Sequence, residues 1–540
     1  MIPVTPRGFK DVLPGEAQWR ESIISNTRDT LSRWGYAPIE TPTLEVLEVL
    51  EQGGALSSTP FRLFDTDNEL LVLRPDVTLQ VARMTASRLK REDLPLRFRY
   101  VERVYREEES QRGLSRQFTQ IGVEAIGLSG PSADAEMVLV LADTLRAAGL
   151  TKFKIALGTV GVLRELLALC VASTAVDQKW SDAMLKAFHA GNYVTIQQLT
   201  EAPGLDSRYA EVLRALPNIT GQAEAISKVE EMVRPLGIVD GLEQLKSTYA
   251  LIEDSDLAEQ VNIDFSVVSS YDYYTGLVVQ AYAPGMGKDL GSGGRYDRMM
   301  EVFGISAPAA GFAVSLESIM QALLNEETSD TAPLKVAIPK GALYAESVAL
   351  LARAGVDTTG LADPGRLLSI ETPGYRFFIV RPTDVPVFTA LGGVDCAICG
   401  HDSLAEQDLE MVEMVDLKFG ACRFVVAEPA EASNKAEDRY QRRGVMRVAT
   451  KYPSITQDYY DSKGVQVEIV KLHGNIELAP FCGLADRVVD ITATGTTLRE
   501  NNLVIVDDVL ESTARFVGNT ASVRTDARVR ALAKRLAALV

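Results

Sequence analysis

The chain is poor in cysteine and contains no long apolar run. It has 540 residues but only five cysteines, too few and too scattered to staple a protein of this size, so we expect reduced thiols and a cytoplasmic location. No segment approaches the ~20 consecutive apolar residues that a membrane span needs. The first residues also lack the apolar core of a signal peptide. We therefore expect no membrane partner.

Residues that ligate structural metals are equally sparse. The three histidines, His189, His401 and His473, show no ligand spacing. Cys396 and Cys399 have CxxC spacing, but they lie in a strand-like segment where positions three apart point to opposite faces. No second cysteine pair completes four zinc ligands. We predict no metal site built from protein side chains alone.

Basic residues are outnumbered by acidic ones. The chain has 55 Lys and Arg against 73 Asp and Glu, which gives a formal net charge of -18. This charge repels a polyanion unless a local basic patch overrides it. We expect no nucleic acid partner.

The length predicts several domains, because a single core stops growing well below 540 residues. A polar, acidic run at 325–333 (NEETSDTAP) is predicted to be a linker. Before it, residues 1–324 contain alternating strand patterns and a helix-rich insertion at about 159–260. We predict an α+β domain with an antiparallel sheet flanked by helices.

Residues 334–540 have a different pattern, in which short apolar strands alternate with helical stretches. This alternation predicts an α/β domain with largely parallel sheets. A polar run at 428–443 is predicted to separate two lobes, and the last helix, near 529–540, is predicted to pack on the first lobe.

One segment predicts a phosphate-binding loop. In RVVDITATGTTLREN an apolar strand reaches Asp490 and runs into Thr494, Gly495, Thr496 and Thr497. Converging backbone N–H groups and threonine hydroxyls satisfy phosphate oxygens, while Gly495 lets the main chain approach closely. Asp490 is placed to bind ribose hydroxyls or help hold a metal ion. The alternative is an ordinary Thr-Gly turn.

The region 334–540 resembles the short-form catalytic subunit of ATP phosphoribosyltransferase. The matching segments occur in the family's order: AIPKG, RPTDVP, GHDSL, DLKFGACRFVVA, RVATKYPSITQDYY, VEIVKLHGNIELAPFCGLAD and DITATGTTLREN. The resemblance implies a two-lobed fold like that of periplasmic binding proteins. It also implies the first reaction of histidine biosynthesis, in which an adenine ring nitrogen of ATP displaces pyrophosphate from phosphoribosyl pyrophosphate. Mg²⁺, held mainly by the substrate phosphates, is the implied cofactor.

The same resemblance assigns residues to the reaction. Arg366 and Lys340 would be catalytic cations, which a reaction between two polyanions requires. The chain departs from the family at Ala342, where Arg is usual, and at His401, where Lys is common. Substrate binding would involve Asp490, Thr494, Gly495, Thr496, Thr497, Leu498, Glu477, Arg381 and Asp384. The alternatives are a solvated loop Arg for Arg366, a helix-terminal carboxylate for Glu477, and an ordinary turn for Arg381 and Asp384.

Residues 5–324 resemble the histidyl-tRNA synthetase core, a class II synthetase fold. The matching segments are RGFKDVLP, RPDVT, RQFTQIGVE, DYYTG, GGRYD and GFAVSLES. Two family arginines that promote adenylate formation are replaced by Ser269 and Ser318, and the transferase-like region follows where an anticodon-binding domain is usual. The positions that hold histidine are retained: Asp76, Thr78, Arg106, Gln120, Glu124, Tyr273 and Tyr274.

A pocket that binds histidine without activating it implies a sensor. The pattern resembles the regulatory subunit that partners short-form transferases, here fused to the catalytic subunit. Histidine would then be an allosteric inhibitor, and a homo-oligomer is implied. Two alternatives remain: a histidyl-tRNA synthetase-like ligase, and a non-catalytic histidine or nucleotide sensor. For Gln120 and Glu124, which share a strand face, the alternative is a structural polar pair.

Overall fold

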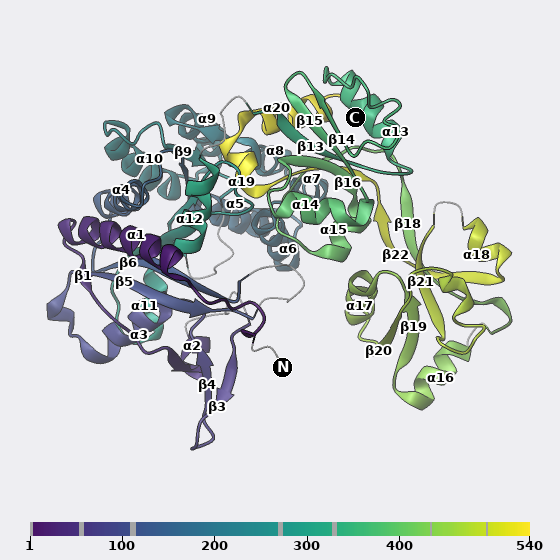
Figure 1. Cartoon of the computed structure of the whole chain (residues 1–540), viewed down its shortest axis with the longest axis horizontal. Helices are drawn as coiled ribbons and strands as arrows, with labels where there is room; N and C mark the ends of the chain where they lie inside the picture. The colour runs from purple at the N-terminus through teal and green to yellow at the C-terminus, as the bar shows by residue number, and fades with distance from the viewer. Residues whose placement is uncertain are drawn as a thin grey trace. The chain divides into compact units, whose positions relative to one another are not determined.

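A computed structural model describes residues 4–52, 59–107, 115–267, 274–326, 332–432, 435–492 and 495–540. The chain divides into two compact units, Met1–Asp330 and Thr331–Val540 (Figure 1). In the described part of the chain, no helix combines the length and apolar character that crossing a bilayer requires.

The first unit is built on a nine-stranded sheet. Neighbouring strands in this sheet run antiparallel, except for the β1–β5 and β7–β9 pairs, which are parallel. The strands in sheet order are β1 (Ala37–Pro38), β5 (Leu96–Tyr105), β6 (Gln117–Ile126), β12 (Ala309–Ser315), β11 (Gly291–Arg295), β10 (Leu277–Tyr282), β7 (Lys154–Thr159), β9 (Val261–Asp264) and β8 (Thr220–Gly221). A small separate sheet has the order β2 (Leu44–Val46), β4 (Leu70–Leu73), β3 (Arg62–Phe64).

Helices cover the large sheet, which explains why β6 is almost wholly buried. Helix α1 contacts β5, and α12 contacts β6 and β12. These and the other helices outside the insertion are α1 (Pro14–Arg33), α2 (Leu47–Gln52), α3 (Thr78–Arg88), α4 (Pro131–Ala147), α11 (Asp297–Val302) and α12 (Leu316–Asn325). The mainly antiparallel sheet with helices on it is the α+β arrangement that the strand patterns predicted.

The segment between β7 and β9 is helical. Its first helix begins directly after Thr159, whose hydroxyl accepts the N–H of Gly161 as an N-cap. The last helix returns to pack on α4 and on the first helix of the segment. The helices are α5 (Val160–Ser173), α6 (Gln178–His189), α7 (Tyr193–Leu199), α8 (Ser207–Ala215), α9 (Ala223–Val233) and α10 (Asp240–Glu253).

The second unit contains two sheets, and both are mixed. The first has the order β14 (Ser369–Thr372), β15 (Tyr375–Val380), β13 (Leu334–Pro339), β16 (Cys396–Gly400), β23 (Ala514–Gly518), β17 (Val412–Asp416). The second has the order β20 (Val467–Lys471), β19 (Met446–Thr450), β21 (Arg487–Thr492), β18 (Cys422–Pro429), β22 (Leu503–Ser512). Only the pairs β13–β15, β13–β16, β19–β20 and β19–β21 are parallel.

The prediction of largely parallel sheets was therefore wrong for three of the five strand pairs in the first sheet and for two of the four in the second. The chain enters the second lobe along β18 and returns along β22, which lies antiparallel to β18 (Figure 1). It then pairs β23 antiparallel with β16 and β17. A strand that returns from another lobe has no βαβ crossover to force parallel pairing.

The chain passes to the second lobe between β17 and β18, before the split predicted at 428–443, and returns between β22 and β23, after it. The polar run there includes α16 (Lys435–Arg443), which packs on β19 within the second lobe. Its polarity is that of a solvent-facing helix. The last helix, α20 (Ala527–Ala537), contacts β17 of the first lobe, as predicted.

Each lobe has its own core. In the second lobe β18 lies between β21 and β22, and its alternating side chains enter two clusters on opposite faces of the sheet. Val425 and Ala427 face one cluster, and Phe424 and Val426 face the other. The other helices of the unit are α13 (Tyr344–Arg353), α14 (Val385–Ala390), α15 (His401–Gln407), α17 (Pro453–Ser462), α18 (Thr496–Glu500) and α19 (Thr520–Thr525).

Candidate active site and effector pocket

A buried carboxylate, Glu124, is the centre of a polar pocket in the first unit. It lies on β6 and is 1 % exposed. Three hydroxyls point at it: Thr78 donates to Oε1 over 2.8 Å, Tyr100 donates to the same oxygen over 3.2 Å, and Tyr296 donates to Oε2. These donors come from α3, from β5 and from the residue after β11, so the sheet and one helix terminus together build the pocket.

Burial and hydrogen bonding oppose each other at this carboxylate. Burial raises the pKa of Glu124 to about 7, although the hydrogen bonds from Tyr296, Thr78 and Tyr100 lower it and the nearby charge of Asp76 adds to the rise. The pKa values of the Tyr100 and Tyr296 hydroxyls are raised well above the ordinary value, mainly by burial. Those hydroxyls therefore remain donors at every physiological pH.

A second pair of charges lies beside Glu124. Asp76 accepts the N–H of Leu79 over 3.4 Å, and burial raises the pKa of its carboxyl while the Arg106 guanidinium lowers it. Arg106 donates Nε–H to the Pro75 carbonyl over 3.1 Å. Its guanidinium carbon lies 4.8 Å from the centre of the Phe118 ring. This packing fixes one cation beside the Asp76 carboxylate.

One polar atom in the pocket lacks a partner. Gln120 is on the same face of β6 as Glu124, four residues away, and is 8 % exposed. Its Oε1 is buried and accepts no hydrogen bond from any described residue. A buried amide oxygen left without a donor points to a ligand that supplies one.

Glycines on neighbouring strands leave room for these side chains. A Cβ at Gly122 would lie 2.3 Å from Cζ of Tyr100, and a Cβ at Gly311 would lie 1.9 Å from Oε2 of Glu124. Gly294 of β11 similarly accommodates Tyr274, which is buried. Three glycines on three adjacent strands thus make space for two tyrosines and the carboxylate.

Contacts and nearby charges link Asp76, Thr78, Arg106 and Glu124, and Gln120 lies on the same strand face as Glu124. Of the remaining predicted residues of the pocket, Tyr274 is among the described residues, whereas Tyr273, like Ser269, lies outside them.

Sequence reasoning missed Tyr100 and Tyr296. Tyr100 pairs with Gly122 across β5 and β6, two rows from Glu124. A glycine paired with a tyrosine, as Gly122 is with Tyr100, indicates space for the tyrosine ring. This indication can be used only once the strand register is known.

Ser318, where active synthetases have Arg, is part of a helix N-terminus. It lies in the first turn of α12, is buried, and donates its backbone N–H to the Ser315 hydroxyl over 3.2 Å. The adjacent Glu317 forms an ion pair with Arg20. Ser318 itself supplies no cation at this position.

A second polar cluster lies in the second lobe, at the carboxyl end of β21. Asp490 accepts the N–H of Ile491 over 2.8 Å. Burial raises the pKa of its carboxyl, the nearby charge of Glu477 raises it further, and Lys451 lowers it. Two carboxylates and one ammonium are therefore close enough to affect one another.

The predicted phosphate loop follows directly. Gly495 has φ +71° and donates its N–H to the Thr492 hydroxyl over 2.7 Å. Thr496 and Thr497 begin α18 and are exposed, and the Thr496 hydroxyl accepts a hydrogen bond from the Arg499 guanidinium over 3.3 Å. The side chain of Leu498 is in the core, which leaves only its backbone for a ligand. Thr494 lies outside the described residues.

Two lysines that the sequence did not single out lie at the same edge of this sheet as Asp490. Lys451 follows β19 and Lys471 ends β20, and both strands are parallel to each other. Asp490, on the parallel neighbour β21, lies at the same edge. Ligands of α/β sheets bind at such carboxyl ends. A Lys at the end of each of two apolar strands could have indicated a binding site. The pattern becomes informative only when the strands are known to be parallel neighbours.

The first lobe carries the other predicted cations. Lys340 and Arg381 directly follow the parallel strands β13 and β15, whose last residues are paired, so they are neighbours. Both are exposed, as is Arg366 in the loop before β14, and none of the three forms an ion pair with a described residue. Asp384 ends a 3-10 turn, Pro382–Asp384, that starts α14. Ala342 is exposed next to this edge.

The two lobes meet through α15 and α17. The Glu406 carboxylate of α15 accepts the N–H groups of Ser454 and Ile455 at the start of α17, over 3.1 and 3.2 Å. Burial raises the pKa of Glu406, and Lys471 lowers it. Lys471 therefore lies near both lobes. The first-lobe cations and the phosphate loop share no contact that the described residues show.

Metal-binding residues do not cluster in the described part of the chain: no group of three or more His, Cys, Asp or Glu side chains is arranged to hold an ion. Cys396 and Cys399 are buried in β16, and burial raises the pKa of both thiols well above the ordinary value. Thiolates are the zinc-ligating form, so this environment disfavours a metal.

Comparison with known proteins separates the chain into two parts. The family model described as histidyl-tRNA synthetase matches residues 8–319, and the model described as ATP phosphoribosyltransferase matches residues 381–538.

Relatives of the first part are ATP phosphoribosyltransferase regulatory subunits. One from Bacillus velezensis is 36% identical over 327 residues, covering 60% of this chain and 83% of that protein. One from Bacillus subtilis is 34% identical, covering 59% and 81%. A solved ATP phosphoribosyltransferase regulatory subunit/histidyl-tRNA synthetase from Bacillus halodurans is 29% identical with a TM-score of 0.56, covering 67% of this chain and 96% of that one.

These matches fall on the two units that the structure separates. The first unit has the class II synthetase-like fold of its relatives, and the matched segment of the second contains β16 to β23 with the phosphate loop. The chain belongs to the histidyl-tRNA synthetase family through a regulatory-subunit unit, and joins it in one polypeptide to an ATP phosphoribosyltransferase unit, a pentosyl transferase of histidine biosynthesis.

Proposed function

We propose that phosphoribosyl pyrophosphate binds at the carboxyl ends of β19, β20 and β21, with its 5-phosphate on the loop from Gly495 to Leu498. The observation that carries this assignment is the cluster of Asp490, Glu477 and Lys451 beside that loop. The N–H groups at the start of α18 and the hydroxyls of Thr496 and Thr497 face the phosphate oxygens. Thr494 adds a further hydroxyl.

Asp490 then accepts hydrogen bonds from the ribose hydroxyls. A carboxylate with a raised pKa gains more from such donors than a fully solvated one, because water no longer competes for it. Glu477, whose charge raises the pKa of Asp490, faces the same sugar. Both residues orient the anomeric carbon rather than react with it.

In the transfer step, an adenine ring nitrogen of ATP forms a bond to the anomeric carbon while the bond to the pyrophosphate oxygen breaks. Pyrophosphate leaves with the electron pair. Lys340, Arg366 and Arg381 on the first lobe, with Lys471 near both lobes, neutralise the charge that develops on the leaving group. Closure of the first lobe over the second supplies these cations, while Asp384 positions the turn that carries Arg381.

We propose Mg²⁺ as the cofactor. The residues fit this ion, because Asp490 and Glu477 are hard oxygen ligands close to the sugar while most of the coordination remains for phosphates and water. When bound, the ion neutralises the pyrophosphate and helps it leave.

We propose that histidine binds the pocket around Glu124 and inhibits the transferase. The unpaired Oε1 of Gln120 and the carboxylates of Glu124 and Asp76 accept from cationic or N–H groups, and Arg106 pairs with a carboxylate. An amino acid with a basic side chain supplies all of these partners. Inhibition implies a coupling that operates in both directions, so the transferase substrates weaken histidine binding equally.

The assembly and location are further proposals. Exposed apolar side chains on the first lobe, those of Leu367, Leu368, Phe388 and Leu391, support a homo-oligomer. Five free thiols support the cytoplasm, and the formal charge of -18 supports the absence of a nucleic acid partner. For the transferase unit we propose the two-lobed fold of periplasmic binding proteins. The two sheets, and the two passages of the chain between the lobes, favour this fold.

The deciding experiment mixes ATP, phosphoribosyl pyrophosphate and Mg²⁺ with the full chain and follows the absorbance of the ribosylated nucleotide, with and without histidine. We expect product formation that histidine suppresses. A lack of product would support a non-catalytic sensor. The ligase alternative is tested by exchange of labelled pyrophosphate into ATP with histidine alone, where we expect no exchange because Ser318 supplies no cation.

A further inference from the structure

A second cavity lies at the opposite end of the same sheet from the phosphate loop. Its volume is about 310 Å³, within the range of small-molecule sites. It lies at the amino end of β21, where Asp486 precedes the strand, whereas Asp490 is near the other end. At about 3.3 Å per residue, roughly 13 Å of strand separates the two aspartates. The cavity is therefore distinct from the proposed substrate site.

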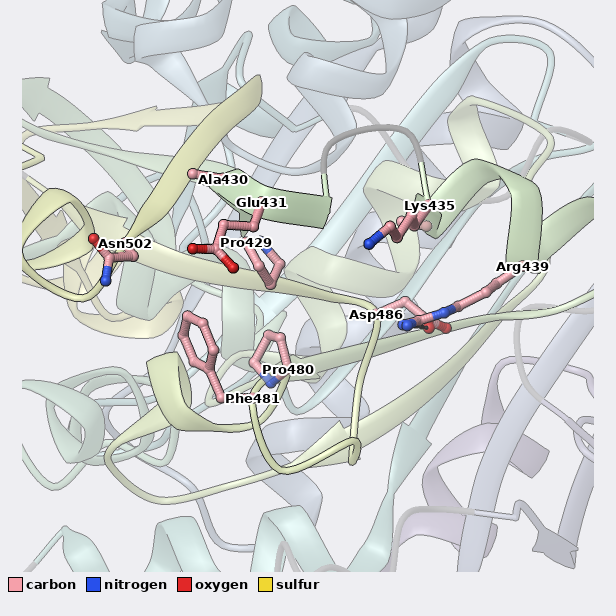
Figure 2. Close-up of a pocket in the computed structure, with 10 residues that line it drawn as sticks. Pro429, Ala430, Glu431, Lys435, Arg439, Pro480, Phe481, Asp486 and Asn502 are labelled. Atoms are coloured by element: carbon pink, nitrogen blue, oxygen red, sulfur yellow. Dashed lines mark hydrogen bonds and ion pairs between the residues drawn. The ribbon is translucent and has the colours of Figure 1, made fainter.

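One end of the cavity is cationic (Figure 2). Asp486 is buried and is neutralised twice, by Arg439 at 3.0 Å and by Arg443 at 3.5 Å, and it also accepts the N–H of Arg447. Lys435 lies at the same end and forms no ion pair with a described residue. The two arginines share the single carboxylate of Asp486, and Lys435 contributes a further positive charge. This end of the cavity therefore retains a net positive charge.

The rest of the cavity is a flat apolar surface with acceptors beyond it. The Phe481 ring is 53 % exposed and lies near Pro480 and Pro429 (Figure 2). Glu431 and Asn502 lie on the side away from Lys435. An exposed aromatic ring flanked by prolines is a surface on which a planar base stacks. A carboxylate and an amide then accept from the amino group at the edge of that base.

We propose that this cavity binds a purine nucleoside monophosphate. Its phosphate pairs with Lys435 and Arg439, its base stacks on Phe481, and its exocyclic or ring N–H groups donate to Glu431 and Asn502. The order of charges along the cavity, cationic, apolar and then accepting, matches the order of phosphate, sugar and base along the nucleotide. Phosphate alone lacks the stacking contact, and an uncharged nucleoside lacks the ion pair.

The site also has a route to the phosphate loop. Asn502 lies just beyond α18, the helix that the phosphate loop begins, and its carbonyl accepts the N–H of Ala430 over 3.0 Å. Phe481 follows the 3-10 turn, Ile476–Leu478, that carries Glu477. A ligand in the cavity therefore contacts Asn502, just beyond the end of α18, and Phe481, which follows the turn of Glu477. The other ends of these two segments lie near Asp490.

The test measures AMP binding to the full chain by equilibrium dialysis. AMP shares its adenine with ATP, a proposed substrate, and is therefore expected to enter the substrate site as well. The readout is therefore the number of AMP molecules bound per chain. We expect the double variant Lys435→Gln with Phe481→Ala to lose one bound AMP, and each single change to weaken that AMP by about tenfold. The variants Lys435→Arg and Phe481→Tyr should retain it.

The matched control is Arg423→Gln, an exposed change at the other end of β18 whose side chain pairs with Asp508. It should leave AMP binding unchanged. Both test side chains are exposed, so circular dichroism should show native folds. The proposal is overturned if the double variant binds as many AMP molecules as the unchanged chain with the same affinity. Because the readout is binding at the amino end of the sheet, it stands whether or not the transferase assay succeeds.

Discussion

The two polar sites of this chain are built in opposite ways. The Glu124 pocket is built by one sheet and the start of α3, and its carboxylate is buried and accepts three hydroxyl hydrogen bonds. The transferase cations Lys340, Arg366 and Arg381 are exposed and lie on a different lobe from the phosphate loop.

The proposed ligands account for this difference. A small amino acid can be enclosed by groups that are already in place, and the satisfied carboxylate limits the free energy lost on burial. Two polyanions need several cations, and cations buried before the substrates arrive would be destabilising. The transferase therefore keeps its charges hydrated on separate lobes, whereas the sensor is preformed.

The largest effect is expected at Asp490, a half-buried carboxylate beside the proposed phosphate loop. Asp490→Asn keeps the shape of the side chain but removes its charge, and we expect turnover to fall by about 10² to 10³-fold, the range for loss of one preorganised group. The absorbance assay measures it. Asp508→Asn is the matched control, because Asp508 is an exposed carboxylate in the same sheet whose ion pair with Arg423 contributes little. Equal activity in both variants would remove Asp490 from the site.

The buried pocket should make stability depend on pH. Below pH about 4.5 Glu124 is protonated in the folded and the unfolded chain, whereas between pH 4.5 and about 7 only the folded chain keeps the proton. The free energy of unfolding therefore falls as pH rises through this window, by roughly 3 kcal/mol in all. In Glu124→Gln that part of the fall should be absent.

The measurement is urea unfolding of both proteins at pH 5 and pH 8, followed by a probe in the first unit. Other groups titrate in both chains and cancel in the comparison. A pH dependence that is identical in the two proteins would mean that Glu124 ionises normally and that the pocket is wetter than its burial indicates.

Histidine binding should respond to the same substitution. Glu124→Gln leaves an amide where a cationic ligand needs a carboxylate, and the loss of a charged hydrogen bond weakens binding by about 10 to 100-fold. Calorimetric titration with histidine measures the change. Glu45→Gln is a suitable control, because this buried carboxylate pairs with Arg83 outside the pocket. Unaltered affinity in Glu124→Gln would show that histidine binds elsewhere.

The sequence predicted the parts of each site that depend on local geometry. Gln120 and Glu124 share a strand face because side chains alternate, and no long-range information is needed for that conclusion. Tyr100 could not be found, because its contact with Glu124 depends on which residues of β5 and β6 pair. Lys451 was missed for the same reason: it becomes a site residue only when β19 and β21 are neighbours.

Strand direction was the other limit. Short apolar strands separated by helices are compatible with parallel and mixed sheets alike, and the return of the chain along β22 decides between them. The polar run at 428–443 was a correct observation about polarity, but a solvent-facing helix, α16, accounts for it.

A smaller effect should come from the cation that the first lobe lacks. Ala342 is exposed beside Lys340, where the resemblance implies Arg. If the open site has too few cations, Ala342→Arg should raise turnover by about tenfold, corresponding to one added charge-assisted hydrogen bond. Ala345→Arg, also exposed and three residues further on, controls for net charge. A similar gain in both variants would point to long-range attraction of substrate rather than a contact in the site.

The smallest effect tests whether the lobes of the transferase are held together before substrate binds. The Glu406 carboxylate accepts two N–H groups at the start of α17, and a carboxylate at a helix N-terminus also interacts favourably with the helix dipole. Glu406→Gln keeps one acceptor but loses the charge, so we expect the second unit to lose about 1 kcal/mol in urea unfolding. Because a linkage between the lobes hinders entry of two polyanions, the same variant should lower the KM for phosphoribosyl pyrophosphate, by less than twofold, while kcat changes little. A several-fold fall in kcat would instead make Glu406 part of the closed, reactive arrangement, and the contrast between a preformed pocket and an open transferase site would then be weaker.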